Sequence, residues 1–312
     1  MEKVLVLMNT YNGSAYLGEQ LDSILSQEEV ETHLFIRDDG STDNTISILN
    51  GYKKRYPDRF TILIGEKNLG PSGSNRVVVE KCPLTFAYFA FSDQDDFWLP
   101  NKLRVALSHL KELEDEKPRL YYSNLSITDA QLNIKFMAYK EGQVTDSYNG
   151  CLPDFYASCN TFVCDKKAIL LFREAEPKLY YHGDIWYQVL CYFLGNVFYD
   201  KDSYILFRRT GSNASGPREK GRKLFYTRSL RFFDLLKSKR TENDTMRQCM
   251  ATDILDRYGD QLPEDKIHVL KAVSKYQESF LNKLKLILDP RVKSCTLSRN
   301  FHMAVRVLFN AF

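Results

Sequence analysis

The chain has 312 residues, enough for one large domain or for one domain with a smaller appendage. Hydrophobic residues make up 44% and charged residues 27% of it, which argues against disorder over most of the chain. The formal net charge is only +3, which argues against a chain built as a whole to bind nucleic acid. Seven cysteines lie at scattered positions without a CxxC pair, so reduced thiols are favoured over a disulfide framework or a zinc site.

Targeting and membrane segments are not evident in the sequence. An apolar strand over residues 3–8 begins almost at the N-terminus, and no signal peptide precedes it. No apolar run approaches the roughly 20 residues needed to span a bilayer. We therefore expect a cytoplasmic protein, at most peripheral to the inner face of the cell membrane.

Short apolar, β-branched runs alternate with helical patterns through the first half of the chain. The expected strands are residues 4–8, 33–37, 60–64 and 86–91, and the expected helices are 16–26, 43–55, 72–81 and 101–114. This alternation predicts a mostly parallel sheet with helices on both faces. Ligands bind beyond the carboxyl ends of such strands, so the site is expected in residues 9–14, 38–42, 66–73 and 92–98.

The pattern changes after about residue 215. Before it, strands are expected at 121–124, 162–164, 197–199 and 203–208, with a helix at 184–194. After it, helices are expected at 223–237, 242–258, 264–288 and 297–309. A turn-rich segment, 211–217, marks the boundary between an α/β domain of residues 1–215 and a helical C-terminal region of residues 216–312.

The start of this C-terminal region is strongly basic. Residues 218–240 contain nine Lys or Arg and two Asp or Glu, a local charge of +7, interleaved with aromatic residues and leucines. A basic amphipathic helix of this kind fits an anionic membrane surface. It also fits a helix that packs on the first domain, and the helical region is equally suited to homodimerisation.

Three carboxylates, Asp93, Asp95 and Asp96, lie within four positions directly after a predicted buried strand. Like charges crowded at a strand end cost stability unless a cation neutralises them. Mg²⁺ commonly takes one or two protein carboxylates together with substrate phosphates, so the segment predicts a metal–diphosphate site. A solvated acidic turn is the alternative, and Asp96 also suits the start of the next helix.

Three further segments follow predicted strands. Asp38 and Asp39 end the second strand, where a carboxylate is able to accept hydrogen bonds from a base imide or a ribose hydroxyl. After the first strand, Tyr11 is suited to stack on a base and Thr10 to bond the edge of that base. The loop 68–74 contains Gly70 and leads into a helix whose amides suit an anion. Each segment alone also fits an ordinary turn.

Together and in this order, these segments resemble family 2 of the inverting glycosyltransferases over residues 3–215. The resemblance implies a GT-A fold, a Rossmann-like mixed sheet flanked by helices, with a helical C-terminal region. It implies a nucleotide diphosphate sugar donor and a Mg²⁺ or Mn²⁺ cofactor. The donor-binding residues it implies are Thr10, Tyr11, Asp38, Asp39, Gly70 and Asp93, and the metal ligands are Asp95 and Asp93.

Two later segments extend the resemblance. Asp184, in the run 181–186, aligns with the family's catalytic base, which takes the proton of the acceptor hydroxyl. Trp186 is expected to form a sugar-stacking wall, and Cys159 falls where the family places an acceptor-site cysteine. A helix N-cap remains the alternative for Asp184.

The closing segment 207–216 supplies Arg208 and Arg209 as expected partners of the diphosphate. Thr210 stands where the family usually has a metal- or phosphate-contacting histidine. Water or the donor phosphates would then fill that position.

Within the family, the run Phe91–Asp96 followed by Trp98 is most similar to bacterial rhamnosyltransferases of cell-wall and capsular polysaccharide synthesis. That likeness implies dTDP-L-rhamnose as donor and a lipid-linked saccharide as acceptor. One alternative is a binding protein that keeps the nucleotide pocket without transferring sugar, suggested by Thr210. Another is a nucleotidyltransferase, although residues 9–14 lack the basic residue such enzymes carry there.

Overall fold

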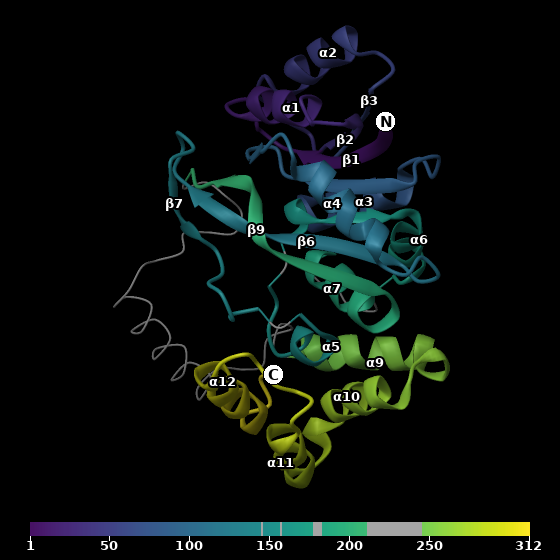
Figure 1. The fold of residues 1–312 in the computed structure, drawn as a ribbon, viewed down its shortest axis with the longest axis vertical. Helices are drawn as coiled ribbons and strands as arrows, with labels where there is room; N and C mark the ends of the chain where they lie inside the picture. The colour runs from purple at the N-terminus through teal and green to yellow at the C-terminus, as the bar shows by residue number, and fades with distance from the viewer. Residues whose placement is uncertain (145, 157, 177–182, 211–244) are drawn as a thin grey trace. The chain divides into compact units, whose positions relative to one another are not determined.

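The structure is a computed structural model that describes residues 1–144, 146–156, 158–176, 183–210 and 245–312. The chain divides into two compact units, and Figure 1 labels most of their helices and strands. The first unit draws its described residues from 1–141, 156–176 and 181–208. The second draws them from 142–155 and 209–312, so residues 142–155 group with the C-terminal helices, which sequence analysis did not anticipate.

One mixed sheet organises the first unit. Its strands run in the order β3-β2-β1-β4-β8-β6-β9-β5, and β7 pairs with β6. The strands are β1 Glu2–Thr10, β2 Val30–Asp38, β3 Phe60–Ile64, β4 Tyr88–Ser92, β5 Phe97–Trp98, β6 Arg119–Thr128, β7 Ile134–Met137, β8 Val163–Asp165 and β9 Asn196–Arg208.

The first four strands are parallel, as the alternating pattern predicted. Residues Val4–Met8 of β1 are buried on both faces, which is why they form a continuous apolar run rather than an alternating one. Beyond β4 the sheet is mixed, because β8 is antiparallel to both β4 and β6. The expectation of a mixed sheet flanked by helices is confirmed.

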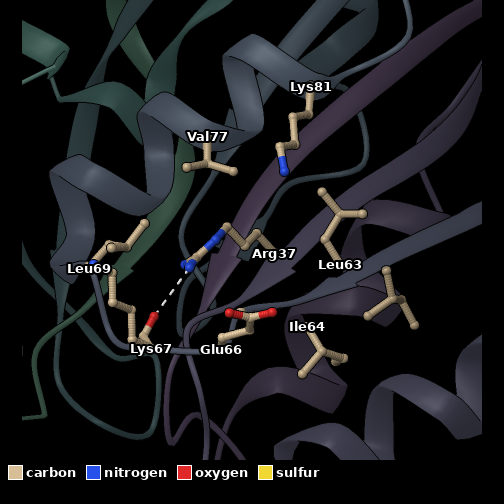
Figure 2. Close-up of a pocket in the computed structure, with 10 residues that line it drawn as sticks. Arg37, Leu63, Ile64, Glu66, Lys67, Leu69, Val77 and Lys81 are labelled. Atoms are coloured by element: carbon tan, nitrogen blue, oxygen red, sulfur yellow. Dashed lines mark hydrogen bonds between the residues drawn. The ribbon is translucent and has the colours of Figure 1, made fainter.

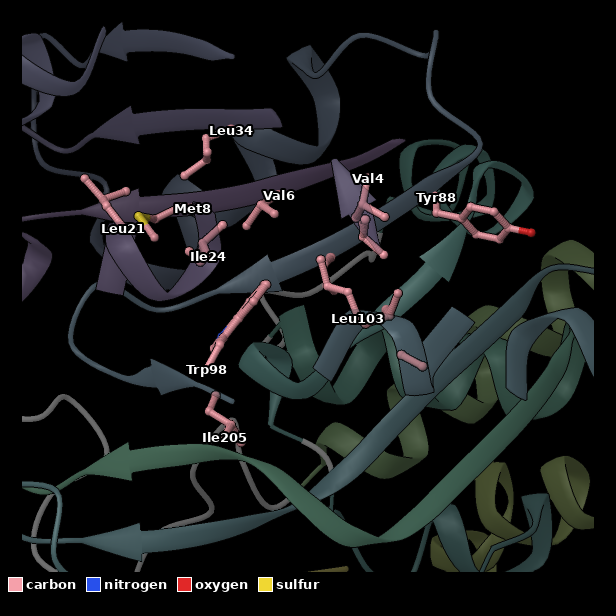
Figure 3. Packing of buried hydrophobic residues seen from close by; sticks show 14 of the residues in the cluster. Val4, Val6, Met8, Leu21, Ile24, Leu34, Tyr88, Trp98, Leu103 and Ile205 are labelled. Carbon is pink, nitrogen blue, oxygen red and sulfur yellow. The ribbon is translucent and has the colours of Figure 1, made fainter. Parts of the chain in front are cut away.

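Helices cover both faces of this sheet. The helices of the first unit are α1 Leu17–Leu25, α2 Thr45–Arg55, α3 Gly70–Lys81, α4 Lys102–Glu112, α6 Lys166–Glu174 and α7 Gly183–Leu194. Helices α3, α6 and α7 contact one another, while α1, α2 and α4 pack with Val4, Val6 and Met8 of β1. Figure 3 shows part of this core, where Trp98 lies between β1 and Ile205 of β9. Two opposite faces of β1 therefore serve two separate helix layers.

The second unit is helical, with α5 Tyr148–Cys151, α9 Met246–Tyr258, α10 Glu264–Ser274, α11 Phe280–Leu288 and α12 Leu297–Leu308. The expected single helix 264–288 is wrong, because a 3-10 turn at Tyr276–Glu278 separates α10 from α11 and Ser279 caps the second helix. The expected helix 223–237 lies outside the described residues. In the described part of the chain, no helix has both the length and the apolar character needed to cross a bilayer.

Candidate active site

Three parallel strands of the first unit end at the same edge of the sheet. Thr10, the last residue of β1, pairs in register with Asp38, the last residue of β2. Ser92, the last residue of β4, pairs with Met8. The loops that follow these strands therefore meet at the carboxyl edge, where sequence analysis placed the site.

Asp38 shapes the loop that follows it. Its buried carboxylate accepts hydrogen bonds from Thr10 Oγ1 (2.8 Å), Ser41 Oγ (2.6 Å) and the amides of Ser41 (2.8 Å) and Gly40 (3.1 Å). Gly40 has a φ of +87°, which an L side chain rarely adopts. The polar side-chain groups of Thr10 and Asp38 thus form hydrogen bonds with each other or within this turn. Contact of either residue with a donor remains a prediction.

Asp39 connects the second strand to the start of α3. Its carboxylate forms a buried ion pair with Arg37 and accepts hydrogen bonds from the amides of Leu69 and Gly70, both at 2.9 Å. Arg37 also donates to Ser74 Oγ at 2.8 Å. The amide of Gly70, expected to meet an anion, is therefore engaged by Asp39. Arg37 was not expected at the site, because its one signal in the sequence is its place directly before the two aspartates.

Tyr11 presents its ring to solvent, with 45% of the residue exposed. Its backbone is held by Gln94, whose side-chain amide accepts from the Tyr11 N–H and donates to the Tyr11 carbonyl oxygen. Gln94 lies between Asp93 and Asp95 in sequence. The loop that carries the exposed ring is therefore fastened to the loop that carries the carboxylates.

Buried hydrogen bonds of Asp96 and Arg208 support the loop that carries Asp93 and Asp95. Buried Asp96 accepts hydrogen bonds from Asn160 Nδ2 (2.5 Å) and from the Arg208 amide (3.3 Å). The guanidinium of Arg208 donates to the carbonyl oxygen of Asp95 (3.0 Å), pairs with Glu19 and is buried. This geometry argues against the expected direct contact of Arg208 with a diphosphate.

Asp93, Asp95 and Asp184 form the carboxylate cluster of the first unit. Partial removal of water from around the Asp93 carboxylate, and then the charges of Asp95 and Asp184, raise the pKa of Asp93 to about 7. The residue nonetheless keeps access to solvent. Burial and the charges of Asp184 and Asp93 likewise raise the pKa of the Cys159 thiol. Cys159 also accepts a hydrogen bond from Asn75 Nδ2 of α3 at 3.4 Å. Residues from four separate segments thus converge on one place.

Helix α7 begins beside this cluster. Asp184 lies in the first turn of α7, and its Oδ1 accepts a hydrogen bond from the Ile185 amide at 2.9 Å. The N-terminal end of a helix carries partial positive charge, which favours a carboxylate there. The helix therefore stabilises one of three mutually repelling carboxylates.

The cluster fits a divalent cation by its donor chemistry. Asp93 and Asp95 offer hard oxygen ligands, and Asp93 lies near enough to Asp95 and Asp184 for their charges to raise its pKa further than burial alone does. Among the described residues, no group of three or more His, Cys, Asp or Glu is arranged to hold a metal. Two protein ligands are nonetheless enough for Mg²⁺ when substrate phosphates supply the others.

The expectation that Trp186 forms a sugar-stacking wall is wrong. Trp186 is only 2% exposed, and its indole N–H donates to the carbonyl oxygen of Ala175 at 2.7 Å. The helical period places it on the inner face of α7 together with Val189, Leu190 and Phe193, all of them buried. Arg209 and Thr210 belong to the second unit, and their expected roles remain predictions.

An open hollow of about 540 Å³ lies at the β3 edge of the sheet beside α3 (Figure 2). It is lined by Arg37, Ile62, Leu63, Ile64, Gly65, Glu66, Lys67, Leu69, Val77 and Lys81. The hollow shares Arg37 and Leu69 with the hydrogen bonds of Asp39. It contains no member of the carboxylate cluster, so the two features are separate.

Comparison with solved structures identifies the fold. Residues 1–349 of TarS from S. aureus, solved in complex with UDP-GlcNAc, align with a TM-score of 0.57 at 15% identity, over 99% of this chain and 89% of that one. The crystal structure of the same region in complex with UDP aligns with a TM-score of 0.55. The mixed sheet with flanking helices is therefore the GT-A fold.

Proteins similar to this chain in sequence are named as sugar transferases. The chain is 39% identical over 105 residues to the dTDP-rhamnosyl transferase RfbG of Shigella flexneri, which is 33% of this chain and 36% of that protein. It is 27% identical over 165 residues to the UDP-Glc:alpha-D-GlcNAc-diphosphoundecaprenol beta-1,3-glucosyltransferase WfgD of Escherichia coli, 52% of this chain and 60% of that protein. Both matches thus span less than two thirds of the relative.

The model of glycosyl transferase family 2 matches residues 5–175, more than half of the chain and the part that carries Asp39, Asp93 and Asp95. The chain belongs to glycosyl transferase family 2 and is a glycosyltransferase.

Proposed function

We propose that this glycosyltransferase moves a sugar from a nucleotide diphosphate donor to a hydroxyl group of a saccharide acceptor, with inversion at the anomeric carbon. The carrying observation is the convergence of Asp93, Asp95 and Asp184 beside Cys159. Two of these carboxylates suit a cation that binds the donor. The third, on a different element, suits a base for the acceptor.

The donor would bind across the carboxyl edge of the sheet. Asp95 and Asp93 would hold Mg²⁺ or Mn²⁺, and a bound divalent ion offsets negative charge on a departing diphosphate. Tyr11 offers an exposed ring on which a flat base is able to stack. Asp39 and the turn shaped by Thr10 and Asp38 lie at the neighbouring strand ends and would face the base and ribose.

Asp184 would act as the base. The acceptor hydroxyl gives its proton to the Asp184 carboxylate as its oxygen forms a bond to the anomeric carbon. The bond from that carbon to the diphosphate oxygen breaks on the opposite face, and the nucleotide leaves with the electron pair. Cys159, half-buried near Asp184 and held by Asn75, would shape the acceptor side of the site.

For the sugar we propose L-rhamnose from dTDP-L-rhamnose, and for the acceptor a lipid-linked saccharide of bacterial cell-wall or capsular polysaccharide synthesis. The name of the Shigella relative supports the donor, and the name of the Escherichia coli relative supports a lipid-linked acceptor. An enzyme with such an acceptor would work on the cytoplasmic face of the membrane.

The test is a panel of nucleotide sugars offered with Mn²⁺, read by donor hydrolysis and by thermal stabilisation of the protein. We expect dTDP-L-rhamnose to give the largest response. Asp184→Asn should keep the thermal stabilisation by donor and lose most transfer, by about 10²-fold or more. Asp202→Asn, an exposed aspartate on β9, is the matched control. Transfer at the wild-type rate by Asp184→Asn would remove Asp184 from the mechanism, and binding without turnover in the wild type would overturn the transfer reaction.

A further inference from the structure

Exposed apolar side chains gather in one short stretch of the second unit. Of the fifteen large hydrophobic residues exposed in the described part of the chain, eight lie between residues 280 and 309. Scattered exposed hydrophobic residues are normal on soluble proteins, whereas a concentration of them marks an interaction surface. All eight lie on α11, on α12 or directly after α12.

Helix α11 exposes one apolar face. Phe280, Leu284 and Leu288 recur every four residues and are 66%, 37% and 74% exposed. Leu281 falls on the same face and is 59% exposed. Leu286, on the other side, is the residue that α11 buries. The described residues of the protein therefore cover little of this helix's apolar surface.

Helix α12 has an apolar arc wider than its buried part. Met303 and Val307 are buried within the second unit. Leu297, Phe301 and Leu308 lie beside them around the helix and are 90%, 67% and 40% exposed. Packing within the unit thus explains one half of the arc and leaves the other half facing solvent.

The two helices are fixed to each other. Lys283 of α11 donates a hydrogen bond to the carbonyl oxygen of Leu308 at 3.1 Å. The chain end is also held, since Tyr276 Oη donates to the Phe312 carbonyl oxygen at 3.1 Å. Figure 1 shows α11 and α12 as neighbours in the second unit. We call the exposed apolar residues of these two contacting helices the docking face, made of Phe280, Leu281, Leu284, Leu288, Leu297, Phe301, Leu308 and Phe309.

The docking face lies in a basic segment. Residues 279–312 contain six Lys or Arg and one Asp or Glu, a charge of +5, against +3 for the whole chain. The single acid, Asp289, is already paired with Arg291 and His268. Lys285 is exposed on α11, next to Leu281 and Leu288 around the helix. Apolar side chains flanked by lysines are the pattern of helices that lie in the interface of an anionic bilayer.

We propose that the docking face binds the surface of an anionic lipid bilayer, with α11 and α12 lying in the interface and their leucines and phenylalanines inserted among the acyl chains. A second copy of the chain is the competing occupant. A symmetric dimer would bring two segments of charge +5 together, which like-charge repulsion opposes. The proposal goes beyond the transfer reaction and does not depend on the identity of the donor.

The test is flotation of the full-length protein with phosphatidylcholine vesicles, with and without phosphatidylglycerol. We expect the wild-type protein to float with the anionic vesicles, to float much less with neutral ones and to be released by high salt. Leu288→Ser with Phe301→Ser should weaken binding on the order of a hundredfold, because two large apolar side chains no longer enter the bilayer. Lys285→Glu should weaken binding to anionic vesicles by about tenfold.

Matched controls carry the same chemical changes on the first unit. Leu170→Ser replaces an exposed leucine of α6, and Lys54→Glu reverses an exposed lysine of α2, and both should bind vesicles like the wild type. Equal binding of the wild type to neutral and anionic vesicles would overturn the role of charge. Unchanged flotation of the Leu288→Ser, Phe301→Ser protein would overturn the proposal outright.

Sedimentation equilibrium separates the lipid surface from a dimer. A wild-type dimer that becomes monomeric with Leu288→Ser and Phe301→Ser would make the docking face a protein interface and overturn the lipid proposal. Donor hydrolysis in the absence of vesicles should be the same in all these variants. Loss of vesicle binding with intact hydrolysis therefore concerns this proposal, and loss of hydrolysis in the wild type concerns only the proposed function.

Discussion

The side-chain amide of Gln94 pairs with both polar groups of the Tyr11 backbone. Gln94 Oε1 accepts from the Tyr11 N–H at 2.9 Å, and Gln94 Nε2 donates to the Tyr11 carbonyl oxygen at 3.0 Å. The same side chain lies over Gly13, so closely that a Cβ at residue 13 would overlap it. The absence of a side chain at Gly13 is therefore what lets the loop after β1 close on the loop after β4.

Under the role that we propose for Tyr11, Gln94 is a positioning residue for the donor. Gln94→Ala should raise the donor KM by about tenfold, since two hydrogen bonds of about 1 kcal/mol each no longer hold the loop that carries the Tyr11 ring. The value of kcat and the Tm should change little. Gln131→Ala, at an exposed turn, is the control. A fall in kcat with unchanged donor KM would contradict the positioning role.

Gly13→Ala tests the same contact from the other side. The new methyl group should displace the Gln94 side chain and raise the donor KM as Gln94→Ala does. In the double variant the two effects should not add, because nothing remains for the methyl group to displace. Full additivity would show that Gly13 acts independently of Gln94.

Removal of one carboxylate of the cluster should remove the effect of metal. Asp95→Ala should abolish the additional thermal stabilisation that donor gives with Mn²⁺ over donor with EDTA. The metal-free protein should be at least as stable as the wild type, because a charge that repels Asp93 is gone. Asp58→Ala, an exposed aspartate before β3, is the control. Metal-dependent donor binding of wild-type strength in Asp95→Ala would exclude Asp95 as a ligand.

The parallel half of the sheet was predictable because its strands are buried on both faces. A run such as Val4–Met8 is apolar throughout and short, which periodicity detects directly. Strand β9 was expected as two strands, because Asp200, Lys201 and Asp202 in its middle look like a turn. In the structure Asp200 accepts a hydrogen bond from Tyr121 of β6 instead. The polar interruption is thus satisfied by a partner 79 residues away, which no local pattern encodes.

The candidate site was proposed from residue types, which do not reveal its internal contacts. The carboxylates after β2 and β4 stand out because like charges rarely crowd a strand end without cause. Which carboxylate is buried in its own loop, as Asp38 is, depends on partners such as Thr10 and Ser41 that three-dimensional folding selects. Trp186 was misassigned for a similar reason, since the face of α7 that packs inward is set by α6 and the sheet rather than by the residues around Asp184.

Trp186→Phe should therefore act on stability and not on acceptor binding. Loss of ring volume from the core and an unpaired Ala175 carbonyl should lower the free energy of unfolding by about 2 kcal/mol or more. The acceptor KM should stay at the wild-type value. Phe136→Leu, an exposed aromatic of β7, should leave both quantities unchanged. A raised acceptor KM without a lower Tm would restore the sugar-stacking role.

The buried ion pair of Arg37 and Asp39 should respond differently to single and double substitution. Arg37→Met leaves the Asp39 carboxylate buried without its cation and should lower the free energy of unfolding by about 3–5 kcal/mol. Adding Asp39→Asn removes that charge and should restore part of the lost free energy of unfolding. Arg76→Met breaks the more exposed pair with Glu80 and should cost less than about 1 kcal/mol. A double variant less stable than Arg37→Met would show that Asp39 is satisfied without Arg37.

Lys102 predicts a dependence of stability on pH. It is 1% exposed, and its Nζ lies 3.7 Å above the centre of the Trp98 ring with no hydrogen-bond partner among the described residues. Burial lowers the pKa of Lys102 to about 7, and the charge of Asp96 acts in the opposite direction without restoring it. In the unfolded chain the pKa of a lysine is about 10.4. Between these values the unfolded state binds a proton that the folded state lacks, so the wild-type protein gains stability as pH rises, by up to about 1.4 kcal/mol per pH unit.

Lys102→Met keeps the apolar stem and removes the titrating group. The variant should be more stable than the wild type at and below neutral pH, and the difference should shrink as the pH approaches about 10. Urea unfolding of both proteins across this range measures the difference, and Lys54→Met on the surface of α2 should run parallel to the wild type. Parallel profiles for Lys102→Met and the wild type would mean that Lys102 stays charged when buried, and that the Trp98 ring and Asp96 together stabilise the ammonium as well as water does.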